Sequence, residues 1–189
     1  MHTDKSLTYS SHCNTICAKA NARASLILHS FRSRYVVVLV KAFVTFVRPL
    51  VEYASPVWSP RLARDTAMVE RVQKCFTKRL PGFRYYNYAK RLQLLKLESL
   101  EARRVKADLI LCYKIVHGLI DIDKYDLFSF VTTSYTRGHD LKIVRKHSVV
   151  NARAFHFSNR VISHWNSLSY SQLHASSVAV FRRSLTSID

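Results

Sequence analysis

Apolar residues recur at helical spacing along most of the chain, and this spacing predicts helices. Five helices are expected in the first part of the sequence, over residues 10–31, 36–53, 65–80, 88–95 and 101–117. A kink or restart is expected at Arg48-Pro49, because proline inside a helix lacks the N–H that the helix needs. The stretch that follows the second helix has two prolines, so we expect a turn there.

The clearest amphipathic pattern lies in residues 65–80. The apolar positions of this stretch fall on one helical face and are Val69, Val72, Phe76 and Leu80. A second face is basic and carries Arg71, Lys74 and Lys78. Because the helix-breaking pair Pro81-Gly82 follows, we expect a helix that ends there, with one face buried and the other exposed.

The pattern changes in the last third of the chain. Residues 130–145 are rich in β-branched and aromatic side chains and contain a turn signal at Arg137-Gly138, so we expect a small β hairpin. Helical spacing then returns through Phe157, Val161 and Trp165, and a final short helix is expected over residues 177–188. With only 3 Gly and 4 Pro, a turn-rich β-sandwich is not expected. The predicted fold is mainly α, with a hairpin and two short C-terminal helices.

The charge balance points to a class of partner. The chain has 30 Lys and Arg against 12 Asp and Glu, for a net charge of +18 and a pI near 10.2. Such an excess weakens the compact state by self-repulsion unless a polyanion neutralises it. Nucleic acid is the first expected partner and an anionic membrane surface the second. The membrane is disfavoured because basic residues alternate with tyrosines instead of facing a broad Leu/Phe surface.

The cysteines and the apolar runs bear on the compartment. Cys13, Cys17, Cys75 and Cys112 form no C-x-x-C pair, and the polar first residues do not resemble a signal peptide, so no disulfide framework is expected. The longest apolar run covers residues 35–47 and is interrupted by a lysine, whereas a membrane span needs about 20 residues. We expect a reduced, soluble protein of the nucleus or cytoplasm.

Four stretches, in this order, resemble the region after the polymerase core of non-LTR (LINE-like) retrotransposon reverse transcriptases, of the jockey or chicken-repeat type. They are residues 39–60, 68–104, 136–143 and 157–185. The run Arg-Pro-Leu-Val-Glu-Tyr-Ala-Ser-Pro-Val-Trp-Ser-Pro within the first stretch is the most specific. The resemblance covers nearly the whole chain from about Ser6. Tyr35 departs from it, because relatives often carry an acidic residue there.

The resemblance implies a thumb-like helical region over residues 1–118 and a C-terminal tail over 119–189, packed as one unit. The parent family is an RNA-directed DNA polymerase whose palm carries an aromatic-Ala-Asp-Asp signature. This chain has no Asp-Asp pair, although polymerase chemistry needs carboxylates that converge on two metal ions. We therefore expect a truncated fragment without catalysis, cofactor or small-molecule substrate.

Two stretches suggest metal binding only superficially. The acidic loop with Asp121, Asp123 and Asp126 lacks the glycine and the terminal glutamate of a calcium loop. Structural zinc favours closely paired cysteines on a turn, whereas Cys13 and Cys17 lie in the helix predicted over residues 10–31. The side chains that could supply zinc ligands are His12, Cys13, Cys17 and Cys75. No metal site is expected.

The candidate nucleic-acid contacts are basic residues in the second of the resembling stretches. They are Arg71, Lys74, Lys78, Arg79, Arg84, Lys90, Arg91, Arg103 and Arg104. Aromatic residues alternate with them, namely Phe83, Tyr85, Tyr86 and Tyr88. Lysine and arginine can follow phosphates while aromatic rings stack on unpaired bases. An ordinary solvated helix face is the alternative interpretation. Trp58 and Trp165 are expected to be core anchors.

The leading hypothesis is sequence-independent binding of an RNA or DNA backbone, as in a region that helps to hold template and primer. A pseudogene product without a selected role fits the same sequence. The alternative from another class is a domesticated helical module that binds a protein partner. The sequence leaves the preference between RNA and DNA open.

Overall fold

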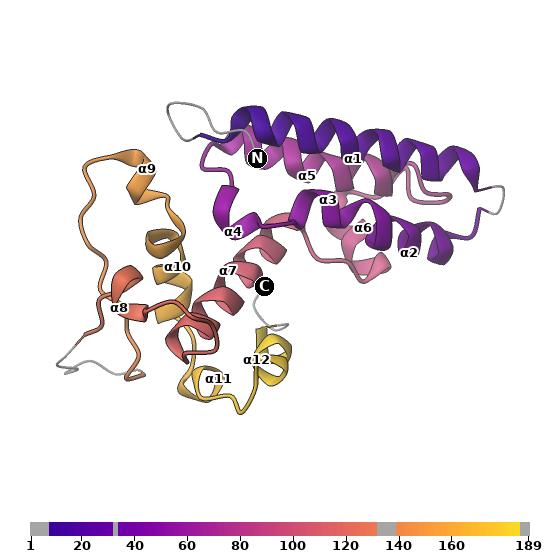
Figure 1. Cartoon of the computed structure of the whole chain (residues 1–189). Coiled ribbons are helices and arrows are strands. Elements are labelled where there is room, and N and C mark those ends of the chain that lie inside the picture. The colour runs from indigo at the N-terminus through magenta and orange to yellow at the C-terminus, as the bar shows by residue number, and fades with distance from the viewer. Residues whose placement is uncertain (1–7, 32–33, 132–138, 186–189) are drawn as a thin grey trace. The chain divides into compact units, whose positions relative to one another are not determined.

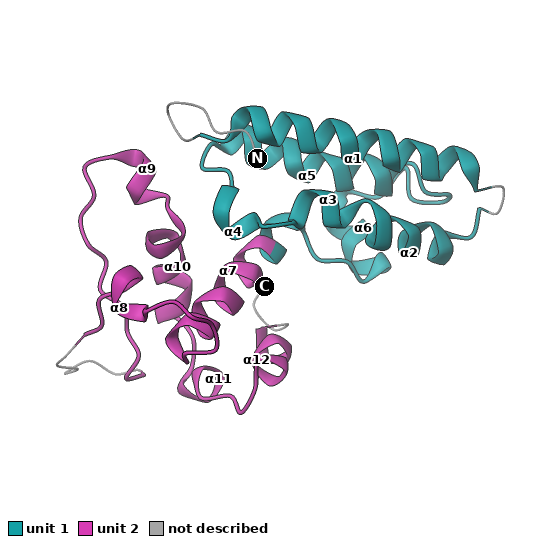
Figure 2. Ribbon diagram, viewed as in Figure 1, with its two compact units in different colours: residues 1–103 teal, residues 104–189 magenta. Residues whose placement is uncertain are grey.

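The computed structural model describes residues 8–31, 34–131 and 139–185. The protein is mainly helical, which confirms what the apolar spacing predicts (Figure 1). Contacts divide the chain into two compact units, residues 1–103 and 104–189 (Figure 2). Each unit buries an apolar core of its own, so the two are described separately.

Unit 1 is a helical bundle in which α1 and α5 run side by side (Figure 1). Helices α2 and α3 both pack against α1, and α6 packs against α5. The helices described in this unit are α1 (Ser10–Ser30), α2 (Val36–Phe46), α3 (Arg48–Glu52), α4 (Ser55–Trp58), α5 (Ala63–Lys78) and α6 (Tyr88–Leu95). A further helix, α7 (Leu100–Val116), begins in unit 1 and continues into unit 2.

The core of unit 1 combines small residues of α1 with larger ones of α5. The buried face of α1 contributes Cys13, Cys17, Ala20 and Ala24. Small side chains let two helices approach closely, because the distance between helix axes depends on the residues at the contact. The predicted apolar face of α5 is confirmed, since its four residues are at most 2% exposed. Phe76 of this face stacks on Phe43 of α2, with ring centroids 4.4 Å apart.

The second predicted helix is interrupted where the proline is. Helix α2 ends at Phe46 and α3 starts at Arg48, with Pro49 in its first turn. A missing N–H is harmless there, because the first helical N–H groups have no partner within the helix. The stretch expected to be a turn contains the short helix α4, and Trp58 Nε1 donates a 2.7 Å hydrogen bond to the carbonyl of Tyr53.

Unit 2 packs short helices around the rest of α7. They are α8 (Lys124–Leu127), α9 (Asn151–Ala154), α10 (Phe157–Asn166), α11 (Tyr170–Leu173) and α12 (Val178–Ser184). Helices α10 and α12 correspond to the two predicted C-terminal helices. The Tyr113 ring of α7 stacks on Phe181 of α12, with centroids 4.3 Å apart. Trp165 of α10 is fully buried.

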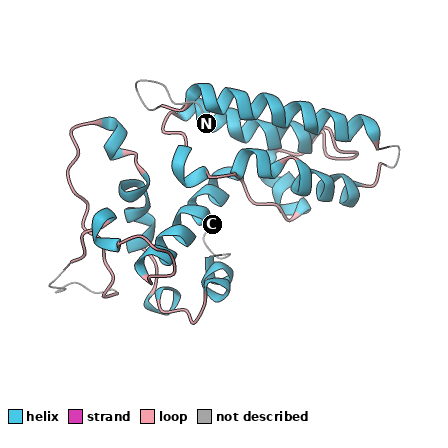
Figure 3. Ribbon diagram, in the orientation of Figure 1, coloured by secondary structure: helices cyan, strands magenta, loops and turns pink. Residues whose placement is uncertain are grey.

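The predicted β hairpin is wrong. In the described residues there is no strand (Figure 3), and 130–145 contributes one antiparallel bridge between Phe130 and Ile143. Two backbone hydrogen bonds flank this bridge, from Val131 N–H to the Lys142 carbonyl at 3.0 Å and from Val144 N–H to the Ser129 carbonyl at 2.7 Å. The backbone N–H and carbonyl of Ile143 therefore face away from Phe130, and side chains of α10 bond this outward edge. Asn166 bonds both the N–H and the carbonyl of Ile143, at 3.0 and 2.9 Å, and Trp165 Nε1 donates to the carbonyl of Leu141. The predicted turn at Arg137-Gly138 lies outside the described residues.

None of the helices that the structure describes is long and apolar enough to cross a membrane.

Candidate nucleic-acid interface

The basic face of α5 is exposed as predicted. Arg71, Lys74 and Lys78 all lie in solvent, whereas Val72 and Phe76 between them are buried. None of the three cations forms an ion pair with another described residue. The Lys74 ammonium lies 5.1 Å from the centroid of the Tyr88 ring, a cation–π distance that holds it beside α6. The row therefore offers unneutralised positive charge.

The loop after α5 continues this basic surface. Arg79 and Arg84 are exposed, and so is Lys90 in the first turn of α6. Arg79 donates a 3.2 Å hydrogen bond to Ser25 Oγ of α1. Gly82 adopts a φ of +81°, a conformation that side-chain-bearing residues rarely adopt. This glycine turns the chain so that Arg84 follows shortly after the end of α5.

The four aromatic residues near these cations differ in their surroundings. Tyr85 is 93% exposed, whereas Phe83 packs against the core and lies edge-on to Tyr86 at a centroid distance of 6.1 Å. The Tyr88 hydroxyl is bonded to Glu70 and Gln73. Partial burial, followed by these contacts with Glu70, raises the pKa of Tyr88. Of the four, Tyr85 is the ring most accessible to a base.

Three of the nine candidate cations are buried or bonded within the protein. Arg91 is 6% exposed and donates to the carbonyls of Tyr86 and Lys74, at 3.1 and 3.2 Å. Arg103 forms a bidentate pair with Glu52, and this contact raises its pKa. Arg104 is only 3% exposed. The six remaining candidates lie on the surface of unit 1.

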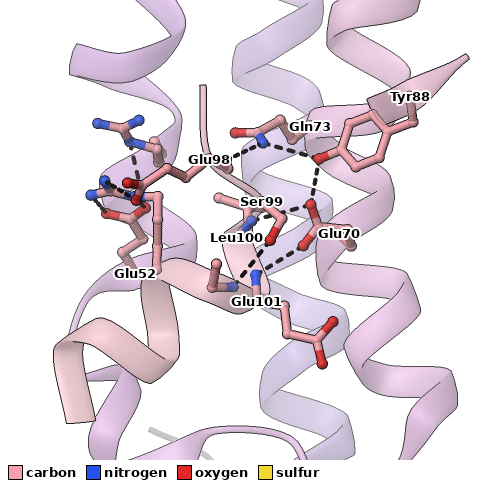
Figure 4. A network of polar contacts seen from close by, with 11 residues as sticks. Glu52, Glu70, Gln73, Tyr88, Glu98, Ser99, Leu100 and Glu101 are labelled. Carbon is pink, nitrogen blue, oxygen red and sulfur yellow. Dashed lines mark hydrogen bonds and ion pairs between the residues drawn. The ribbon is translucent and has the colours of Figure 1, made fainter. Parts of the chain in front are cut away.

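A buried polar network sets the positions of α5, α6 and α7 (Figure 4). Glu70 accepts hydrogen bonds from the backbone N–H groups of Leu100 and Glu101, at 3.1 and 3.0 Å, and from the Tyr88 hydroxyl. Gln73 donates to the Tyr88 hydroxyl and to the carbonyl of Glu98. Glu70 thus satisfies N–H groups at the start of α7 that lack partners within the helix. This role of Glu70 was not predicted from the sequence.

Acidic groups of unit 1 are turned inward. Its sequence has 18 Lys and Arg against 6 Asp and Glu, whereas unit 2 has 12 against 6. Asp65 and Glu70 are buried, and Glu52 and Glu98 pair with Arg103. Among the described acidic residues of this unit, only Glu101 is exposed. The outer surface is therefore more positive than the composition alone indicates.

Several of the residues considered as metal ligands cap a helix or pack in the core. In the described residues, no three His, Cys, Asp or Glu side chains gather where a metal ion could bind. Asp123 caps α8 through Tyr125 N–H, at 2.9 Å. Cys13 and Cys17 are buried in the core, and the His12 ring lies edge-on to Trp58 at 5.3 Å. Trp58 and Trp165 are confirmed as core residues, at 1% and 0% exposure.

Comparison with family models, with curated proteins and with solved structures finds no match for this chain.

Proposed function

We propose that this chain binds the sugar-phosphate backbone of RNA or DNA through unit 1, without reading the base sequence. The observation that carries the proposal is the separation of charge, with cations exposed along α5 and the following loop while the described carboxylates of the unit, apart from that of Glu101, are buried or paired. Binding would replace self-repulsion of these cations by contact with phosphates and release condensed counterions. The resemblance to the region after the core of retrotransposon reverse transcriptases supports the same partner.

The geometry of α5 suits a backbone contact. Arg71 and Lys78 are seven residues apart, which corresponds to about 10 Å along a helix. Duplex DNA carries roughly one charge per 1.7 Å of its axis, so the row passes several phosphates. Contacts with phosphates position a protein but carry no sequence information. Affinity should therefore be similar for unrelated sequences and fall steeply with salt.

The test is a salt titration of binding to labelled duplex, single strand and hybrid. Each lost phosphate contact should flatten the log–log slope by about 0.9 on duplex and about 0.7 on single strands. The variant Arg71→Ala/Lys74→Ala/Lys78→Ala should therefore flatten it by roughly two to three units. The control removes the same charge from α1 and α2 through Lys19→Ala/Arg23→Ala/Lys41→Ala, which are exposed cations of the same unit. Equal slopes for the two triple variants would contradict a contact at α5.

The same proposal assigns no polymerase chemistry to the chain itself. Phosphoryl transfer needs converging carboxylates that hold two metal ions, and the sequence has no Asp-Asp pair. The purified 189-residue chain should not extend a primer with Mg²⁺ or Mn²⁺. Nucleotide incorporation that a chelator abolishes would show this part of the proposal to be wrong.

A second candidate function is a protein-interaction module, and the exposed apolar residues at both ends of α2 favour it. Val37 is 79% exposed and Phe46 is 55% exposed, and Tyr35 just before the helix is 75% exposed. Exposed apolar side chains such as these can contribute to an interface. A protein module of this kind would bind its partner equally well when the three α5 cations are replaced by alanine.

A further inference from the structure

Unit 2 contains a cavity of about 320 Å³ beside α9 and α10. This volume is at the lower end of the roughly 300–1,000 Å³ that ligand pockets occupy. The residues that line it are Arg145, Lys146, His147, Ser148, Ala154 and Asn159. None of them was among the nucleic-acid contacts expected from the sequence, although Arg145 and Lys146 are consecutive cations.

One buried amide fixes the walls of this cavity. Asn159 of α10 is 8% exposed, and its Nδ2 donates to Ser148 Oγ at 3.2 Å and to the carbonyl of Arg153 at 2.7 Å. These bonds connect the segment before α9, the helix α9 itself and α10. The basic segment is thereby joined to α9 and α10, so the position of the cavity wall at Ser148 is fixed by folded structure.

The charge at the cavity is mainly positive and unneutralised. Arg145, Lys146 and Arg153 are exposed and form no ion pair with a described residue. By contrast, Arg160 in the same region is neutralised by Asp108, with Nε 2.7 Å from Oδ2. A smaller adjoining cavity of about 50 Å³ shares Lys146 and Asn159, and Asp126 is the carboxylate that lines it. Partial burial, Arg160 and Arg153 lower the pKa of His156, which agrees with a positive local field.

We infer that this cavity binds the phosphate group of a nucleotide. Arg145 and Lys146 provide charged donors for the phosphate oxygens, and Ser148 provides a hydroxyl at the wall. Charge-assisted hydrogen bonds of this kind are the stronger ones in proteins. A carboxylate has fewer oxygens and less charge than a phosphate monoester, which carries about −1.5 to −2 at neutral pH. The cavity is formed by residues of unit 2 alone, and the inference does not depend on the function proposed for unit 1.

The phosphate can come from a free nucleotide or from the end of a nucleic-acid strand, and the probes separate the two sources. The full chain is titrated calorimetrically with inorganic phosphate, a nucleoside 5′-monophosphate, and a short oligonucleotide with and without a 5′-phosphate. Saturable binding of the monophosphate, more tightly than inorganic phosphate, is expected. Stronger binding of the phosphorylated oligonucleotide than of the monophosphate would identify the strand end as the source.

The decisive variant is Arg145→Ala/Lys146→Ala, which should weaken monophosphate binding by roughly tenfold or more. The matched control, Arg182→Ala/Arg183→Ala, removes two consecutive exposed cations from α12 of the same unit and should leave binding within about twofold. Equal weakening in both variants would overturn the inference, as would the absence of saturable binding to the wild-type chain.

A second measurement does not depend on variants. Titration of the wild-type chain with the monophosphate should shift the backbone amide resonances of Ser148 and Asn159, and unchanged resonances there would overturn the inference. Replacement of Arg71, Lys74 and Lys78 by alanine should not alter monophosphate binding. Failure of the α5 proposal and failure of the cavity proposal are therefore distinguishable.

Discussion

Glu70 is a buried carboxylate whose two oxygens accept three hydrogen bonds, two from the start of α7 and one from Tyr88. Replacement by alanine would leave all three donors without this partner. An unsatisfied buried donor costs about 1–3 kcal/mol, so Glu70→Ala should lower the free energy of unfolding by about 3 kcal/mol or more. Urea unfolding followed by circular dichroism measures this change.

Glu101 is the matched control, because it is an exposed acidic residue in the first turn of the same helix. Its interaction with the helix dipole contributes about 0.3–1 kcal/mol, so Glu101→Ala should have a smaller effect than Glu70→Ala. Similar losses for the two variants would show that Glu70 does not hold the start of α7.

The Tyr85 ring should raise the affinity of the chain for single strands but not for duplex. A base stacked on an aromatic side chain contributes about 1–3 kcal/mol, so Tyr85→Ala should weaken single-strand binding by roughly 5- to 100-fold. Duplex binding should not change, because paired bases are not available to the ring. Filter binding with normal and abasic strands measures both effects, and the abasic strand should bind the variant and the wild type equally.

The control for Tyr85 is Tyr53→Ala. Tyr53 is 83% exposed in the same unit but does not belong to the basic α5–α6 surface. Its replacement should leave all affinities unchanged. A loss of single-strand binding as large as that of Tyr85→Ala would point to a general effect of exposed aromatic surface.

Helical spacing alone predicts the exposure of some cations of the interface but not of others. The exposure of Arg71, Lys74 and Lys78 follows from the amphipathic period of α5. The burial of Arg91 does not, because its partners are carbonyls of Tyr86 and Lys74 that only the packing of α6 on α5 brings near. Long basic side chains bury their stems easily, so composition indicates the charge of the surface but not which cations reach solvent.

Features of helices that have a local cause could be predicted from the sequence, whereas features that depend on tertiary packing could not. The restart at Pro49 was predictable, because the missing N–H is a local property of the chain. The hairpin prediction failed because β propensity depends strongly on tertiary context. Here the described residues form a single bridge, and α10 holds the outer edge of the second segment through the backbone of Leu141 and Ile143.

Replacement of Asn166 tests whether α10 holds the segment that contains Ile143. Asn166→Ala would remove two hydrogen bonds to Ile143, and we expect the free energy of unfolding to fall by about 2 kcal/mol. Amide exchange at Ile143 should become faster than at the core of α7. The control is Ser163→Ala, an exposed position of the same helix, which should change neither quantity. Unaltered exchange in Asn166→Ala would show that the segment is held by other contacts.

For the whole molecule, acidification should affect unit 2 through its histidines. Burial is the first cause that lowers the pKa of His117 and of His139 below the ordinary value of 6.5. A depressed pKa means that the folded state resists protonation. Stability is therefore complete above pH 6.5 and is lost as the pH falls through the folded values. Between pH 7 and about 5.5, hydrogen-exchange protection factors, which are corrected for the intrinsic pH dependence of exchange, should fall more in residues 104–189 than in 1–103.

Asp108 also contributes to the pH dependence of the stability of unit 2. Burial raises its pKa, so its effect has the opposite sign, with stability present below the ordinary carboxylate range and lost as the pH rises through the folded value. His117→Gln should reduce the pH dependence of unit 2. An equal pH dependence in the variant and the wild type would exclude His117 as a source.

The division into units could not be derived from the apolar pattern. The helical spacing through Val105, Leu109, Cys112 and Val116 has no interruption that would mark a boundary within α7. Which core a helical face joins depends on its partners, and Leu100 belongs to one cluster while Leu109 belongs to the other. Net charge, by contrast, is a property of composition and was available from the sequence alone.

The placement of the two tryptophans gives each unit a built-in optical reporter. Trp58 and Trp165 are the two tryptophans of the chain, and each is buried in a different core with its Nε1 bonded to a carbonyl. Unfolding would expose either indole to water and shift its emission to longer wavelength. Trp58→Phe and Trp165→Phe would each leave a single emitter, so the melting of one core could be followed without signal from the other.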